Sequence, residues 1–187
     1  MDQRTLVERA RGGDHDAFTT LVDVSIRRLD AAARLVLRDR ELASDAVQDT
    51  LIRAWRDLPR LRDPDRFDAW LHRLLINACL DLARRRRRRP IEVDFIATDL
   101  IEPGEPAGIV ADRELVDTAL QRLEPAHRAV VVMHYFLGMP LVEVASSLSI
   151  PVGTAKSRLH YSLAAMRATL ADDLIVGPTS APGGQPA

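Results

Sequence analysis

The chain has 187 residues, and its formal net charge is −1 because 26 Lys and Arg face 27 Asp and Glu. A lone cysteine, Cys79, excludes a disulfide framework, and five scattered histidines offer no cluster at zinc-ligand spacing, so we expect no metal and no other cofactor. The N-terminus lacks an apolar signal segment and the longest apolar run, Ala129 to Met133, is too short to span a membrane, so we expect a soluble, cytoplasmic protein with no membrane insertion of its own.

The near-neutral total hides an uneven distribution of charge. Residues 1–89 hold 20 Arg against 15 acidic residues, a net of +5, whereas residues 90–111 hold five acidic residues and no base. Lys156 is the only lysine, so nearly all basic side chains are guanidinium forks, which suit phosphates and base edges. Genomic codon bias explains the surface arginines at large equally well.

Apolar residues recur three and four positions apart almost everywhere outside 90–111, which predicts an all-α protein. Within 1–89 the breaks are Gly12-Gly13-Asp14, where Asp14 can cap the next helix, Arg38-Asp39-Arg40, and Pro59 to Pro64. The predicted helices lie near 2–11, 15–37, 41–57 and 65–87.

Segment 90–111 has three prolines, two glycines and no helical period, so it is predicted to be a flexible acidic linker that could reach ~70 Å if extended. Periodicity resumes over 112–174, where Pro125, Gly138-Met139-Pro140 and Ile150-Pro151 separate four further helices. The Pro- and Gly-rich tail, 175–187, is predicted to be disordered. The chain is therefore expected to form two small helical domains, 1–89 and 112–174.

The helix near 41–57 has a polar face that its own stability does not explain. Asp45 and Asp49 are like charges four residues apart, and Gln48 and Ile52 lie on the same face. An exposed Ile52 among polar groups would suggest a docking surface for a protein. An Ile52 packed on a neighbouring helix, with aspartates that merely cap or solubilise, is an equally good interpretation.

The helix near 65–87 carries a polar stripe that runs into six consecutive arginines, 84–89. The stripe consists of Arg73, Asn77, Asp81, Arg84 and Arg88. A block of arginines repels itself, so it suits phosphate contact, although basic runs also mark localisation signals or frayed helix ends. Asn77 and Asp81 could in addition read the edge of an unpaired base.

The strongest local pattern spans Pro140 to Leu170. A short helix, a turn at Ser149-Ile150-Pro151 and a longer helix opening at Val152 are typical of a helix-turn-helix. On the longer helix an apolar face opposes a group of polar and cationic residues near its N-terminal end: Thr154, Lys156, Ser157, Arg158, His160 and Tyr161. A major groove would receive that end, whereas an ordinary solvated face is the simpler alternative.

With these motifs the sequence resembles an extracytoplasmic-function (ECF) RNA polymerase sigma factor of the sigma-70 family. DAVQDTLIRAW is similar to the core-polymerase-binding helix of its sigma-2 domain, FDAWLHRLLINACLDLARRRRR to the helix that melts and reads the −10 promoter element, and IPVGTAKSRL to the sigma-4 helix that reads the −35 element. The resemblance implies a sigma-2 helical bundle at 1–89 and a sigma-4 helix-turn-helix at 112–174.

The resemblance also implies roles for individual residues. Asp45, Gln48, Asp49 and Trp55, with Ile52 on the same face, would bind core polymerase through its beta and beta-prime subunits. Asn77 and Asp81 would contact a flipped −10 base, flanked by Arg73, Arg84, Arg85 and Arg88. The −35 helix would use the six residues from Thr154 to Tyr161 given above, although many relatives carry Arg where this chain has Tyr161.

The implied function is that of a non-catalytic specificity subunit that binds core RNA polymerase and promoter DNA, with an anti-sigma factor as a further expected partner. The acidic linker would lie in a basic polymerase channel. The main rival is an ordinary helix-turn-helix regulator whose first domain serves oligomerisation or sensing. An enzyme fits poorly, since no phosphate-binding loop, HExxH or nucleophile motif is present.

Overall fold

The computed structural model of the chain describes residues 2–88 and 115–175. Its first part contains α1 (Gln3–Arg11), α2 (His15–Leu37), α3 (Arg40–Asp57) and α4 (Phe67–Arg88), with single 3₁₀ turns between α3 and α4. Each boundary lies within two residues of its predicted place. Asp14 caps α2 as expected, because its side chain accepts a hydrogen bond of 3.0 Å from the Ala17 amide. Asp39 caps α3 in the same way through the Leu42 amide.

The second part supplies the four further helices. Residues 115–121 are helical, and α6 (Pro125–Val131), α7 (Leu141–Ser147) and α8 (Val152–Ile175) follow. No strand occurs among residues 2–88 and 115–175, so the all-α prediction is confirmed for them. The predicted linker at 90–111 and, from residue 176, the predicted tail lie outside the described residues.

One irregular turn follows α6. Residues Val132–Phe136 form a π-helical turn, η3, which ends where the Leu137 amide donates to the Val132 carbonyl at 2.9 Å. Gly138, at φ +72°, then reverses the chain toward α7, and the His134 ring nitrogen Nδ1 lies 2.9 Å from the Met139 carbonyl oxygen. These contacts set the entry to the helix-turn-helix.

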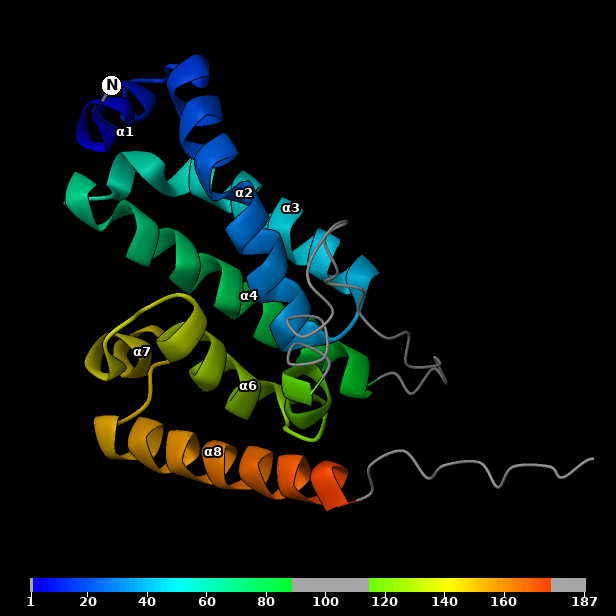
Figure 1. The fold of residues 1–187 in the computed structure, drawn as a ribbon. Coiled ribbons are helices and arrows are strands. Elements are labelled where there is room, and N and C mark those ends of the chain that lie inside the picture. The colour runs from blue at the N-terminus through cyan, green and yellow to red at the C-terminus, as the bar shows by residue number, and fades with distance from the viewer. Residues whose placement is uncertain (1, 89–114, 176–187) are drawn as a thin grey trace, which may run out of the picture.

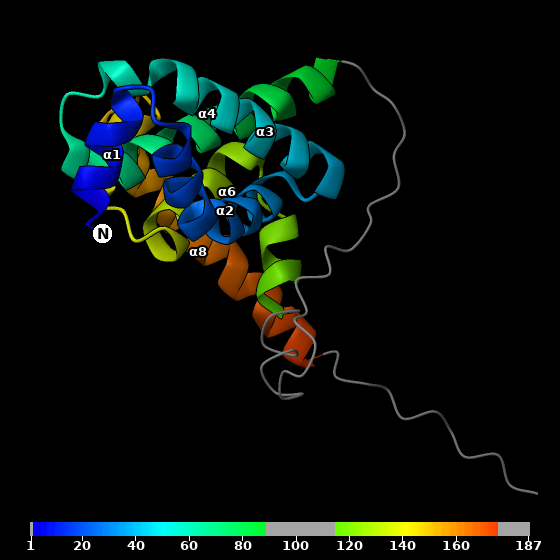
Figure 2. The same ribbon diagram turned by 90° about the horizontal axis from the view of Figure 1, so that it is seen from above.

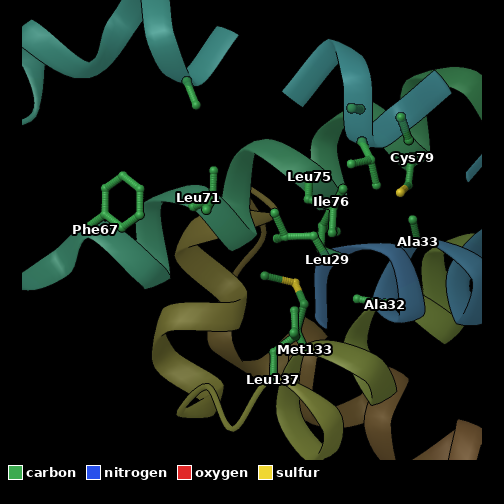
Figure 3. Packing of buried hydrophobic residues seen from close by; sticks show 14 of the residues in the cluster. Leu29, Ala32, Ala33, Phe67, Leu71, Leu75, Ile76, Cys79, Met133 and Leu137 are labelled. Carbon is green, nitrogen blue, oxygen red and sulfur yellow. The ribbon is translucent and has the colours of Figure 1, made fainter. Parts of the chain in front are cut away.

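The helices are stacked in layers (Figures 1 and 2). α2, α3 and α4 pack together, α6 lies against α2 and α4, and α8 packs on α6 and α7 on the far side. A single buried apolar cluster runs through this stack and includes Leu29 of α2, Ile76 of α4 and Met133 of η3 (Figure 3). The two domains therefore share one core, which the pattern of separate modules did not predict.

Helix α4 shows the consequence of that shared core. The side of α4 opposite its polar stripe is buried at Phe67, Leu71, Leu75 and Ala78. His72, Ile76 and Cys79 of α4 are also buried, and Ile76 and Cys79 belong to the cluster that includes residues of α6 and η3. The residues of the polar stripe remain exposed or partly exposed.

Candidate functional site

The polar face of α3 is open to solvent. Ile52 is 68% exposed, so the interpretation in which it packs on a neighbouring helix is wrong. Asp45 and Gln48 are exposed beside it, and Asp49 is partly exposed. An exposed apolar side chain beside two carboxylates, on a helix whose opposite side is buried in the core, is suited to a protein partner.

Two residues hold this face in place. Asp49 forms an ion pair of 2.7 Å with Arg53 one turn later, so its carboxylate has a fixed direction. Trp55 is half-buried, with its ring stacked on His15 at 4.2 Å between centroids and set edge-on to Phe18 at 5.1 Å. The structure thus places Trp55 at the contact between α3 and α2, one helical turn beyond Ile52.

The α4 stripe lies together along one side of the helix. Arg73, Arg84, Arg85 and Arg88 are exposed, whereas Asn77 and Asp81 are partly exposed between them. Arg84 donates a hydrogen bond of 2.6 Å to the Asp81 carboxylate and forms an ion pair with it. The Asp81 carboxylate and the Asn77 amide, one helical turn apart, therefore lie within a basic surface. That arrangement can bind a phosphate backbone and offer hydrogen bonds to a base at once.

The arginine run also contains a residue that sequence reasoning missed. Arg86 forms an ion pair of 2.8 Å with Asp39, the residue whose other carboxylate oxygen caps α3. This contact joins the end of the basic helix to the start of the acidic one. Nothing in a uniform run of arginines marks one member as structural, because its partner is 47 residues away in the sequence.

The helix-turn-helix is present as predicted. α7 ends in a turn in which Ser149 has φ +53° and the Ile150 amide donates to the Ala145 carbonyl at 3.0 Å, and α8 begins at Val152. Lys156, Ser157, His160 and Tyr161 are exposed on the first turns of α8, with Tyr161 68% exposed, while Thr154 and Arg158 are partly buried. All six side chains carry groups that can form hydrogen bonds, and four of them are fully at the surface.

The residues of α8 that are buried are not all members of the apolar face that the sequence predicts. Ser162 and Thr169 are buried, whereas Leu163 and Leu170 lie at its edges. Both hydroxyls donate to the carbonyl four residues earlier, Arg158 and Ala165, at 2.7 and 3.1 Å. Small side chains with locally satisfied hydroxyls thus occupy the buried face of α8, which counting apolar residues alone does not reveal.

Other kinds of site are not supported. Among the residues that the structure describes, no group of three or more His, Cys, Asp and Glu side chains could hold a metal ion. The same described helices include none with the length and apolar character needed to cross a membrane. Cys79 is buried, and this burial raises the pKa of its thiol to about 12, so a nucleophilic role is unfavourable.

Comparison with known proteins identifies the family. The Sigma-70 region 2 model matches residues 21–89, and the Sigma-70 region 4 model matches residues 113–166. The ECF RNA polymerase sigma factor SigL of Mycobacterium tuberculosis is 37% identical over 135 residues, which cover 71% of this chain and 76% of SigL. The chain belongs to the ECF RNA polymerase sigma factors. The resemblance inferred from the sequence is thereby confirmed.

The fold of this sigma factor agrees with solved relatives. The structure of CnrH in complex with the cytosolic domain of CnrY has a TM-score of 0.66 at 30% identity, covering 91% of this chain and 98% of CnrH. RpoE of Bartonella quintana, solved with the anti-sigma factor NepR, has a TM-score of 0.70 at 23% identity, covering 83% and 98%. As a sigma factor, the chain binds RNA polymerase and directs promoter-specific initiation of transcription.

Proposed function

We propose that three separate surfaces carry this activity. Asp45, Gln48, Asp49 and Ile52 of α3 dock on core polymerase, with Trp55 holding their helix in place. The α4 stripe captures unpaired −10 bases through Asn77 and Asp81, and its arginines hold the backbone. The first turns of α8, from Thr154 to Tyr161, read the −35 duplex in the major groove.

The observation that carries this proposal is exposure. Most of these side chains reach solvent, although the helices that bear them are buried in a shared core on their other sides. Like charges that cluster on a surface repel one another, and an exposed apolar side chain such as Ile52 is unfavourably hydrated. A polymerase surface and a polyanionic backbone would relieve both costs.

The role is that of a non-catalytic specificity subunit in the cytoplasm. Polymerase supplies the chemistry, while this chain supplies recognition of two DNA elements. An anti-sigma factor is a further partner that we include in the proposal, because RpoE of Bartonella quintana, which has the same fold, was solved with the anti-sigma factor NepR.

Run-off transcription with purified core polymerase tests the docking surface. Asp49→Arg places a cation on the acidic face and removes the ion pair with Arg53. Promoter-dependent transcript should fall at least about tenfold, corresponding to a binding loss of ~1.4 kcal/mol. The far-UV circular dichroism spectrum should stay unchanged, because the residue lies on the surface.

Asp23→Arg is the matched control, since Asp23 is an exposed aspartate of α2 outside the three surfaces. It changes the net charge equally and should transcribe normally. Normal transcription by both variants would contradict the assignment of the α3 face. An equal loss of transcript in both variants would mean that the change in net charge, rather than a docking surface, is responsible.

A further inference from the structure

A cavity lies in the first domain, where α1, α2 and α4 meet. Its volume is about 330 Å³, which is within the range in which proteins hold small ligands. None of its lining residues belongs to the three surfaces proposed above. A ligand could therefore occupy this cavity without touching the residues assigned to polymerase or to DNA.

One side of the cavity is apolar. It is formed by Leu6 of α1, Leu21 of α2 and Phe67 of α4, each of which is at least nine-tenths buried. We call these three residues the apolar wall. Val24 also lines the cavity and is 83% exposed, so an apolar ligand would cover a side chain that is otherwise hydrated.

The polar side of the cavity includes a buried histidine. His72 is 7% exposed and forms no hydrogen bond within the part of the chain that the structure describes. Desolvation is the main reason why its pKa is lowered from 6.5, so at neutral pH the imidazole is uncharged and has one donor and one acceptor nitrogen. Because buried polar groups are nearly always hydrogen-bonded, a ligand with a polar group would supply the missing partner.

Two opposite charges line the same cavity without an ion pair. Within residues 2–88 and 115–175, Asp68 forms neither an ion pair nor a hydrogen bond. Arg28 forms no ion pair in these residues either, and it donates one hydrogen bond of 2.8 Å to the Phe136 carbonyl, which leaves several of its N–H groups for a ligand. Asp68 raises the pKa of His72 and Arg28 lowers it, so both charges lie near the buried ring.

The ligand that matches these groups carries both charges. A simple carboxylate would be repelled by Asp68, a simple amine would be repelled by Arg28, and an uncharged molecule would leave both charges unpaired. We propose that the cavity binds a free α-amino acid with an apolar side chain. Its ammonium group pairs with Asp68 and its carboxylate with Arg28, and its side chain packs on the apolar wall. His72 is a further hydrogen-bond partner, and the site is independent of the three surfaces of the proposed function.

Leucine and two of its derivatives test the proposal on the full-length chain. Leucine carries both charges, leucinamide lacks the carboxylate, and N-acetyl-leucine lacks the ammonium group. Leucine should bind with a Kd of about 0.1–1 mM, measured from the shift of the His72 Cε1 proton resonance. Each derivative should bind at least about tenfold more weakly, because one ion pair is lost.

Two results with the unmodified chain would overturn the proposal. One is the absence of a saturable shift with leucine, valine and phenylalanine at ~10 mM, well above the expected Kd. The other is an affinity for leucinamide or N-acetyl-leucine equal to that for leucine. Neither result depends on whether a variant folds.

Substitutions at the two charged positions show which charge of the ligand each residue binds. Asp68→Asn should weaken leucine binding at least about tenfold, while N-acetyl-leucine, which has no ammonium group, should bind no more weakly than before. Arg28→Gln should weaken leucine binding similarly and leave leucinamide binding no weaker than before. The reverse pattern would contradict the assignment of the two charges.

Asp23→Asn is the matched control for Asp68→Asn. Asp23 is an exposed aspartate of α2 that does not line the cavity, and its substitution changes the net charge equally. The variant should bind leucine as the unmodified chain does, and far-UV circular dichroism confirms that each variant is folded. Equal weakening by Asp23→Asn and Asp68→Asn would make net charge the cause and overturn the proposal.

Discussion

Neighbouring arginines of this chain have different tasks, because each task depends on what the guanidinium group contacts. Arg85 is exposed on α4, whereas the next residue, Arg86, turns back to Asp39. Arg38 and Arg128 are buried between the domains and contact Asp117 and a backbone carbonyl. The basic composition that suits DNA therefore includes arginines that never reach it.

Adjacent arginines in α4 give a matched pair of variants. Arg85→Ala should weaken promoter binding by polymerase several-fold and lower the slope of log affinity against log salt by about 1, with unchanged stability. Arg86→Ala should lower stability by roughly 0.5–1 kcal/mol through loss of the Asp39 contact. Filter binding and urea denaturation check the two effects, and a swapped outcome would contradict the assignment.

His72 couples folding to pH. It is buried in α4, and desolvation, opposed by Asp68 and reinforced by Arg28, lowers its pKa from 6.5. The unfolded state therefore binds more protons, so stability should decrease as pH falls below about 6.5 and level off below the folded pKa. The carboxyl groups of Asp14 and Asp57, whose pKa values are lowered from 3.8, contribute only in more acidic solution.

Urea denaturation of His72→Gln between pH 7 and 5 measures this coupling. The variant should lose less stability over that range than the unmodified chain, whatever its absolute stability. An identical pH dependence of the two proteins would show that His72 is not the group responsible.

Among the elements, the helix-turn-helix and its entry have two turn positions in the left-handed backbone region, one occupied by serine and one by glycine. Ser149 adopts φ +53° and Gly138 adopts φ +72°, a region that costs an L-residue about 1–2 kcal/mol. The space that a Cβ would occupy at Gly138 has no neighbouring atom within 4 Å, so only backbone strain opposes a side chain there.

Exchanging the residue types at these turns should change stability in opposite directions. Ser149→Gly should stabilise the chain by about 0.5 kcal/mol, after the entropy of the unfolded glycine is subtracted, and Gly138→Ala should destabilise it by about 1 kcal/mol. Thermal denaturation checks both signs. Destabilisation by Ser149→Gly would mean that the Ser149 side chain contributes more than its backbone costs.

As a single body, the chain should unfold in one step. Met133 of η3 is fully buried in the cluster that also contains Leu29 and Ile76, so Met133→Ala should cost about 2–5 kcal/mol. Because both domains share this cluster, calorimetry should show one transition that moves to lower temperature. The matched variant Val142→Ala, at an exposed position of α7, should change stability by less than about 0.5 kcal/mol.

Two separate transitions, of which only one moves in Met133→Ala, would contradict a shared core.

The sequence by itself determined the helices, the Asp14 cap and the family. Helical periodicity and residues such as Asp14 and Gly138 act locally, so the boundaries of α1 to α4 and the position of the helix-turn-helix followed from neighbours in the chain. The polar faces of α3, α4 and α8 could be predicted for the same reason, since a helix fixes which residues share a side.

Only the tertiary structure decided what those faces meet. The pairing of Arg86 with Asp39 and of Arg38 with Asp117, the stacking of Trp55 on His15 and the burial of Ser162 all join residues whose proximity depends on how helices pack. The merging of two domains around Met133 and Ile76 is of this kind. Such contacts depend on how the surfaces of helices distant in sequence fit together, and a local sequence pattern does not specify which of these helices will be neighbours.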